Sequence, residues 1–238
     1  MRRVYDKPQL ECRMPNPPVL KLVIGNKNYS SWSMRPWVLA RQSAIAFEEV
    51  QLKFEGKSTR VVGIEPYSPT RKVPVLLVDG EPVWDSLAIC ETLAELHPEK
   101  QPWPAAADAR RVARSICAEM HSGFQGLRSA MPMNIRGSHP GKGRTPQSEK
   151  DIERVIAIWT SCRSRFGRGG EFLFGRFSVA DAFYAPVVMR FRTYAVSMPP
   201  QAQAYAEAVE AAAAVREWAD AGRREAEVVA ADEPYASR

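Results

Sequence analysis

The pattern of apolar positions divides the chain into a part that contains strands and a part that does not. Apolar runs with strand composition or alternation occur at residues 20–24, 47–54, 73–79 and 82–84. Apolar residues recur at helical spacing over 34–46 and 86–97. Strands and helices thus alternate within about 80 residues, which predicts a compact α/β unit.

The rest of the chain predicts helices alone. After a proline-rich stretch at 98–104, Ala, Arg, Glu and Leu dominate. Helical patterns cover residues 105–130, 147–166, 179–196 and 201–224. The predicted organisation is a leader at 1–18, an α/β domain at 19–98, a linker at 99–107 and an all-helical domain at 108–238.

Two local signals help to place the helices. Ser178 and Asp181 have the spacing of a capping box, in which each side chain bonds the backbone of the other, and apolar residues follow at every fourth position. Cys90 lies on an apolar helical stripe and is expected in the core.

Charge and composition then limit the classes of function. The 33 Lys and Arg outnumber the 27 Asp and Glu, which gives a net charge of +6. The basic loop at 136–144 has no interleaved aromatic residues, so we expect no nucleic-acid partner. The four cysteines and three histidines show no metal-ligand spacing, and we expect no metal. No apolar run is long enough to span a membrane, and we expect a cytoplasmic protein.

Three stretches of the sequence together carry a resemblance to a known family. The first is residues 28–36 (NYSSWSMRP), and the third is residues 172–182 (FLFGRFSVADA). The second consists of Lys72-Val73-Pro74 followed by Trp84-Asp85-Ser86. In this order the chain, over about residues 19–225, resembles the serine-type cytosolic glutathione transferases, and most of all their zeta-like and bacterial members. The resemblance implies a thioredoxin-like α/β N-terminal domain with a mixed four-stranded sheet, followed by an all-α helical-bundle C-terminal domain. It also implies a homodimer with a role in detoxification.

The chemistry implied is thiolate attack by glutathione, the co-substrate, on a small apolar electrophile. A hydroxyl donor near the sulfur favours the ionised thiol, and so does the positive end of a helix. The family's spacing from the serine to a helix arginine selects Ser30, five residues before Arg35, with Ser31 as the alternative. Pro36 predicts that the helix begins near residues 33–35, with Ser33 as its N-cap.

The resemblance also implies residues that hold glutathione. A cis bond between Val73 and Pro74 would turn the polar backbone groups of Val73 toward the cysteinyl backbone. Asp85 would take the γ-glutamyl ammonium group, and Ser86 with the helix N-terminus would take its carboxylate. Lys72 stands where many members of the family have Gln, and as a cation it can meet a glutathione carboxylate.

The second substrate is expected to contact a wider set of residues. The candidates are Trp32, Met131, Met133, Asn134, Arg136 and Arg192. Arg190 and Arg192 cannot share one helix face, so we expect at most one of them to point inward. Zeta-type members have a cysteine where this chain has Trp32, which disfavours their isomerase activity. The alternatives are a non-catalytic interaction module and a glutathione-dependent isomerase or peroxidase.

Overall fold

The N-terminal part of the molecule is built on a mixed four-stranded sheet. The computed structural model describes residues 17–236, so residues 1–16 of the predicted leader lie outside the described part. The strands are β1 (Leu20–Ile24), β2 (Glu48–Gln51), β3 (Val75–Val78) and β4 (Glu81–Trp84). Their order is β2-β1-β3-β4, with β1 parallel to β2 and the other pairs antiparallel. The inner strand β1 is buried at every residue except the half-buried Lys21, as its mostly apolar sequence predicts.

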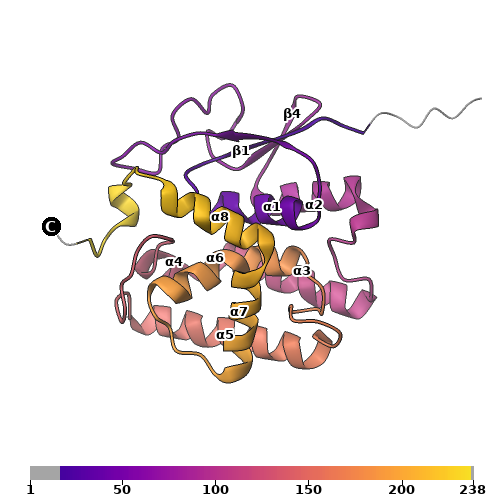
Figure 1. Ribbon diagram of the computed structural model, residues 1–238, viewed down its shortest axis with the longest axis vertical. Helices are drawn as coiled ribbons and strands as arrows, with labels where there is room; N and C mark the ends of the chain where they lie inside the picture. The colour runs from indigo at the N-terminus through magenta and orange to yellow at the C-terminus, as the bar shows by residue number, and fades with distance from the viewer. Residues whose placement is uncertain (1–16, 237–238) are drawn as a thin grey trace, which may run out of the picture.

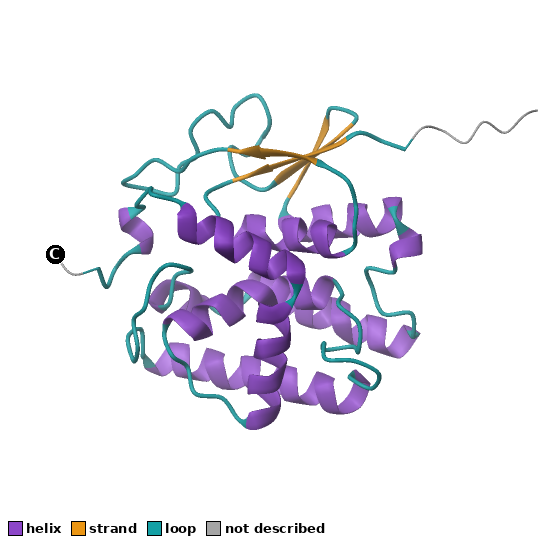
Figure 2. Ribbon diagram, in the orientation of Figure 1, coloured by secondary structure: helices purple, strands orange, loops and turns teal. Residues whose placement is uncertain are grey.

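Two helices lie between this sheet and the rest of the molecule (Figures 1 and 2). They are α1 (Ser31–Gln42) and α2 (Ser86–Leu96). Helix α1 contacts the sheet, α2, and two helices of the C-terminal part. Trp37 and Val38 in α1 are completely buried, and the apolar core runs through them from the sheet into the helical part.

The remaining chain is all helical, which confirms the predicted fold class. After the short turn η1 (Pro98–Lys100), the α-helices are α3 (Ala107–Ser122), α4 (Gln125–Ala130), α5 (Pro146–Phe166), α6 (Val179–Thr193), α7 (Pro200–Ala211) and α8 (Ala213–Arg224). Helix α6 is buried along almost its whole length and packs on α1, α3 and α7. A second short turn, η2 (Ala230–Asp232), follows α8. No helix among the described residues is long and apolar enough to cross a membrane.

Two long helices predicted from the sequence are in fact pairs of helices. The segment at 105–130 is divided at Phe124, whose φ of 61° is left-handed and cannot continue an α-helix. The segment at 201–224 is divided at Ala212, where ψ is 132°. The second break is hidden in an alanine run, which favours helix locally. Packing decides it, because α8 turns back so that the Trp218 indole donates to the Lys27 carbonyl at 2.9 Å.

Helix α1 also begins earlier than predicted. Its first residue is Ser31 and its N-cap is Ser30, rather than Ser33. The Ser33 hydroxyl cannot serve as the cap because it accepts from the Gly25 N–H at 3.2 Å, which ties the helix to the end of β1. Pro36 therefore lies inside the helix, where it cannot donate a hydrogen bond to the carbonyl four residues back.

The start of α6 depends on Asp181, as the predicted capping box requires. Its carboxylate accepts from the backbone N–H of Ser178 at 2.8 Å, from the Ser178 hydroxyl at 2.9 Å and from the N–H of Leu173 at 3.0 Å. Asp181 is fully buried, and burial raises the pKa of its carboxyl to about 6. These bonds join α6 to the loop that follows α5.

We expect Asp181→Ala to lower the free energy of unfolding by about 2–4 kcal/mol, because three buried or partly buried donors lose their acceptor. Asp181→Asn keeps one oxygen acceptor and should lose less. The folded pKa of Asp181 lies above the unfolded value of 3.8, so this carboxyl stabilises the fold at low pH and loses that contribution as the pH rises to about 6. In urea titrations, the free energy of unfolding of the wild type should exceed that of Asp181→Asn by more at pH 4.5 than at pH 7. An equal difference at the two pH values would contradict the raised pKa of Asp181.

Candidate active site

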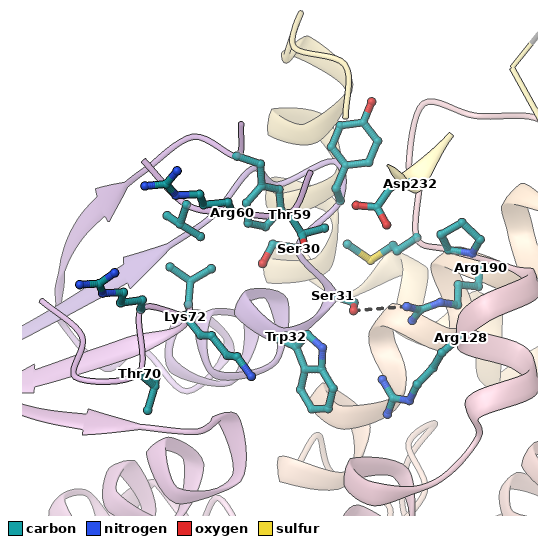
Figure 3. A pocket seen from close by; sticks show the side chains of 17 residues that line it. Ser30, Ser31, Trp32, Thr59, Arg60, Thr70, Lys72, Arg128, Arg190 and Asp232 are labelled. Atoms are coloured by element: carbon teal, nitrogen blue, oxygen red, sulfur yellow. Dashed lines mark hydrogen bonds between the residues drawn. The ribbon is translucent and has the colours of Figure 1, made fainter. Parts of the chain in front are cut away.

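A cavity of about 560 Å³ lies between the two parts of the molecule, at the N-terminus of α1 (Figure 3). One wall comes from the N-terminal part, including Ser30, Ser31 and Lys72. The opposite wall comes from the helical part, with Arg128 of α4 and Arg190 of α6. The cavity is further lined by Tyr29, Trp32, Phe54, Thr59, Arg60, Val61, Thr70, Arg71, Val73, Pro132, Met133 and Asp232.

The two serines at the start of α1 differ in their hydrogen bonds. Ser30 donates its hydroxyl proton to the Ser33 oxygen at 2.7 Å. The Ser31 oxygen instead accepts from Nη2 of Arg190 at 3.3 Å, as the dashed line in Figure 3 marks. The proton of Ser31 is therefore left to donate into the cavity, and the arginine polarises its hydroxyl.

Trp32 forms the floor between the two walls. Its ring lies 4.2 Å from the guanidinium carbon of Arg35 and 4.7 Å from that of Arg128. The imidazole of His121 meets the same ring edge-on, with ring centroids 5.3 Å apart. An indole held between two guanidinium groups is a favourable cation–π arrangement, and it brings two positive charges close to the serines.

Three cations surround this part of the cavity, of which Arg35 and Arg190 are buried and Arg128 is half-buried. Within residues 17–236, none of Arg35, Arg128 and Arg190 forms an ion pair with a carboxylate. Burial and the charge of Arg128 lower the pKa of Arg190 to about 9, and burial lowers the pKa of Arg35 well below its usual range. The Nε of Arg35 has no hydrogen-bond partner. Such a cluster of cations favours a negative charge placed among them.

A second cavity of about 400 Å³ adjoins the first, and Trp32, Lys72 and Val73 are among the residues that line both. The Val73–Pro74 peptide bond is cis, as predicted. Asp85 caps α2 by accepting from the Leu87 N–H at 2.9 Å. The remaining lining residues are Thr70, Trp84, Ser86 and His121.

Both carboxylate oxygens of Asp85 are engaged. One accepts from Leu87, and the other lies 3.1 Å from Nε2 of His121. Ser86 is buried behind it and accepts from a guanidinium nitrogen of Arg35 at 3.4 Å. His121, on α3, is thus a contact of the second cavity that the sequence pattern did not indicate.

The structure brings together most of the site residues expected from the sequence. The two cavities are lined by nine of them, namely Ser30, Ser31, Trp32, Lys72, Val73, Pro74, Asp85, Ser86 and Met133. The other four lie outside both cavities. Met131 is fully buried in the core, and Asn134 is buried where its side-chain oxygen accepts from Asn28 at 2.9 Å. Arg136 donates to the carbonyl of Glu227, after α8, and Arg192 is exposed beside Glu210, 3.9 Å away.

Arg190, rather than Arg192, is the arginine of α6 that points inward. It follows Phe183 by seven residues and Pro186 by four, so it lies on the face of α6 that turns toward α1. Its position in an otherwise apolar helical pattern was a usable signal. Arg128 and Asp232 had no comparable signal, since they reach the cavity from a short helix and from the segment after α8.

The segment at residues 225–236, called the C-terminal segment below, is fastened to the loop before α1. The Glu225 carboxylate accepts from the N–H groups of Lys27 and Asn28 at 2.7 and 3.0 Å, and from the Gln51 side chain at 2.5 Å. Arg136 donates to the carbonyl of Glu227 at 2.7 Å. These bonds bring η2, and with it Asp232, to the rim of the first cavity.

Comparison with known proteins places this arrangement in a family. The family model described as the N-terminal domain of glutathione S-transferase matches residues 29–96, and the model for its C-terminal domain matches residues 144–221. The chain belongs to the glutathione S-transferase family. The family and the fold expected from the sequence are therefore confirmed.

The curated relatives of this glutathione S-transferase family member include isomerases. The probable maleylacetoacetate isomerase of Caenorhabditis elegans is 32% identical over 172 residues, which cover 71% of this chain and 78% of that protein. The maleylacetoacetate isomerase of Dictyostelium discoideum is 25% identical over 111 residues, 47% of this chain. This chain spans only about half (51%) of that relative's length.

Solved structures show the same fold. A glutathione transferase homologue from Burkholderia gl BGR1, with bound glutathione, superposes with a TM-score of 0.66 at 22% identity, over 87% of this chain and 100% of that one. A bacterial zeta-class maleyl pyruvate isomerase superposes with a TM-score of 0.65 at 20% identity, over 86% of this chain and 99% of that one.

Glu225→Ala should loosen the loop before α1, because two backbone N–H groups and one amide lose their acceptor. We expect faster amide hydrogen exchange at Lys27 and Asn28 and a loss of about 2–3 kcal/mol in the free energy of unfolding. Glu217→Ala, which removes an exposed carboxylate paired with Arg41 at 3.2 Å, is the matched control and should change neither. Unchanged exchange at Lys27 and Asn28 in Glu225→Ala would contradict this role.

Proposed function

We propose that the protein is a glutathione transferase that binds glutathione along its two adjoining cavities and activates the thiol at the N-terminus of α1. The observation that carries this proposal is the meeting of Ser31, Lys72, Val73 and Asp85 along one continuous lining. The family relationship supports transferase activity, and the site residues are assigned from their geometry. Cytoplasmic location and a homodimer stay predictions.

The second cavity fits the γ-glutamyl end of glutathione. The carboxylate of Asp85 is at hand for the ammonium group, and the N-terminus of α2 with Ser86 suits the α-carboxylate. Lys72, which lines both cavities, is placed to attract a carboxylate of the bound peptide. Val73 lies between the two cavities, so the cysteinyl residue would lie against its backbone, with its sulfur directed toward Ser31.

Ser31 is the hydroxyl that we assign to the sulfur. Glutathione's thiol resembles that of cysteine, with a pKa of about 8.5, so only a few per cent is ionised at neutral pH. A shift of about two units requires roughly 2.7 kcal/mol of preferential binding of the thiolate. Ser31 can donate one charge-assisted hydrogen bond, since its oxygen already accepts from Arg190, whereas the Ser30 proton is used by Ser33.

The surrounding cations work in the same direction. Arg190 and Arg128 line the cavity from the helical side, and Arg35 lies beneath Trp32. The N-terminus of α1 adds its partial positive charge, and no acidic residue lies in its first turn. Each of these stabilises a thiolate relative to a thiol, without taking part in a proton transfer.

Glutathione-dependent isomerisation is the second candidate, and the relatives named maleylacetoacetate isomerase favour it. It would use the same thiolate, which adds to a carbon–carbon double bond and leaves again after rotation. Both reactions therefore share the activation step at Ser31. They differ in whether the carbon–sulfur bond persists in the product, which is directly measurable by mass spectrometry of glutathione adducts.

We expect Ser31→Ala to lower kcat/KM for conjugation of 1-chloro-2,4-dinitrobenzene at pH 7 at least tenfold. The pKa of bound glutathione, followed by thiolate absorbance, should rise by about one to two units, because one hydrogen bond to the thiolate is lost. Glutathione affinity, measured by calorimetry, should change little, and Ser31→Thr should restore much of the rate.

Ser30→Ala is the matched control one residue away. It should keep conjugation within about threefold of the wild type, because its hydroxyl proton is directed at Ser33. A large loss in Ser30→Ala with normal turnover in Ser31→Ala would reverse the assignment. Failure of the wild type to bind glutathione would overturn the proposed function as a whole.

A further inference from the structure

Asp232 is the acidic residue among those that line the first cavity. It lies at the end of η2 in the C-terminal segment, and its half-buried side chain is directed into the cavity, on the side of Arg190 (Figure 3). Within residues 17–236, its carboxylate forms no ion pair and no hydrogen bond that would give it a structural role. Its backbone N–H donates to the Val229 carbonyl at 2.9 Å, so the turn itself does not need the side chain.

Asp232 and Arg190 act on each other through space. The charge of Asp232 favours the ionised form of Arg190, and Arg190 favours the ionised form of Asp232. Both residues line the same cavity, and within residues 17–236 they do not form an ion pair with each other. A substrate group placed there would meet the cation of Arg190 on one side and the anion of Asp232 on the other.

The positive charge of Arg190 is therefore partly offset by the negative charge of Asp232 in the same cavity. Without Asp232, the guanidinium groups of Arg128 and Arg190 would form an anion subsite, since no carboxylate pairs with either of them in the described part of the chain. With Asp232 ionised, an anionic substrate group gains attraction from the arginines and suffers repulsion from the carboxylate. An uncharged polar group experiences neither effect to the same extent.

We propose that Asp232 is a specificity-determining residue, which weakens the attraction of the second-substrate side of the cavity for anionic electrophiles relative to uncharged ones. This inference rests on the proposed function, because it concerns the partner of glutathione in that same cavity. It assigns a role to the C-terminal segment, which reaches the site through the contacts of Glu225 and Arg136.

The preference should depend on pH. Burial raises the pKa of Asp232 to about 6, and the neighbouring Glu233 adds to the rise while Arg190 opposes it. Below about pH 6 the carboxyl is neutral, its repulsion is lost, and anionic electrophiles should gain relative to uncharged ones. Of the other charged or titratable groups, Tyr29 and Arg128 line the same cavity, and Tyr194 interacts with Asp232 through its charge. The pKa of both tyrosines is raised, mainly by burial, so they stay neutral between pH 5.5 and 7.5, and the Arg128 guanidinium stays charged.

The test uses two electrophiles of nearly the same size that differ in charge, 4-chloro-3,5-dinitrobenzoate and 4-chloro-3,5-dinitrobenzamide. In both, the glutathione sulfur forms a bond to the ring carbon at position 4, and chloride leaves with the electron pair of the broken bond. The measured quantity is the ratio of kcat/KM for the benzoate to kcat/KM for the benzamide, each divided by its uncatalysed rate constant. Ionisation of the thiol affects both substrates equally and cancels in this ratio.

In Asp232→Asn, the ratio at pH 7.5 should rise about tenfold over the wild type, because one negative charge near the bound substrate is removed. In the wild type the ratio should rise as the pH falls from 7.5 to 5.5, whereas in Asp232→Asn it should stay flat. Asp232→Ala should behave like Asp232→Asn if the charge, rather than the shape of the side chain, is responsible.

Two controls separate a local effect from a general one. Asp220→Asn removes an exposed carboxylate of α8 that pairs with Arg223 at 2.6 Å, and it should leave the ratio unchanged. Glu233→Gln removes the next carboxylate of the same segment, which accepts from the Tyr29 hydroxyl at 2.5 Å and is not among the cavity-lining residues. Its effect on the ratio should be much smaller than that of Asp232→Asn.

The outcomes are distinguishable. Normal turnover of the benzamide with an unchanged ratio in Asp232→Asn would overturn the inference and leave the proposed function intact. An equal rise in Asp220→Asn would also overturn it, because the effect would then follow net charge alone. No conjugation of either electrophile by the wild type would overturn the proposed function itself.

Discussion

The loop that joins β1 to α1 is buried, and its backbone polar groups need partners inside the protein. Asn26 and Asn28 have no exposed surface, and Lys27 is only 8% exposed. Unsatisfied backbone groups at such depth are costly, so a loop of this kind exists only where other segments supply donors and acceptors. Here the partners are the Glu225 carboxylate, the Trp218 indole and the residues around Asn134.

The position of the serines follows from this constraint. The loop ends at Ser30 and leads directly into α1. The position of the first turn of the helix therefore depends on how firmly the loop is held. Gly222 in α8 approaches the backbone of Lys27 and Asn28 so closely that an added Cβ would lie about 3.2 Å from it. The helical domain thus holds the N-terminus of α1 against the cavity and also supplies the arginines that face it.

The sequence predicted those parts of the site that depend on neighbouring residues. The serines, the Val73–Pro74 bond and the Asp85–Ser86 cap are local patterns, each visible in a few consecutive residues. The sheet and most helices follow from apolar spacing for the same reason. The break at Ala212 could not be predicted, because alanine favours a continuous helix and only the packing of α8 opposes it.

The opposing wall of the cavity depends on contacts between residues far apart in the chain. Arg190 and Arg192 are two residues apart on one helix, and only the packing of α6 against α1 decides which of them is buried. Asp232 reaches the cavity because the C-terminal segment is bound elsewhere, by Glu225 and by Arg136. No local pattern encodes the positions of Arg128 and Asp232, and this is why their charges in the cavity could not be predicted.

The bond between Lys27 and Glu225 spans 198 residues, and it has a consequence for the order in which the site is made. During synthesis the loop before α1 leaves the ribosome long before Glu225 is made. Until then, the backbone N–H groups of Lys27 and Asn28 lack the carboxylate that accepts their hydrogen bonds. Contacts of such sequence separation also form late in folding, since the entropy of closing the chain must be met first. A ribosome-bound chain that lacks α8 can hold a nearly complete sheet and still have no finished pocket.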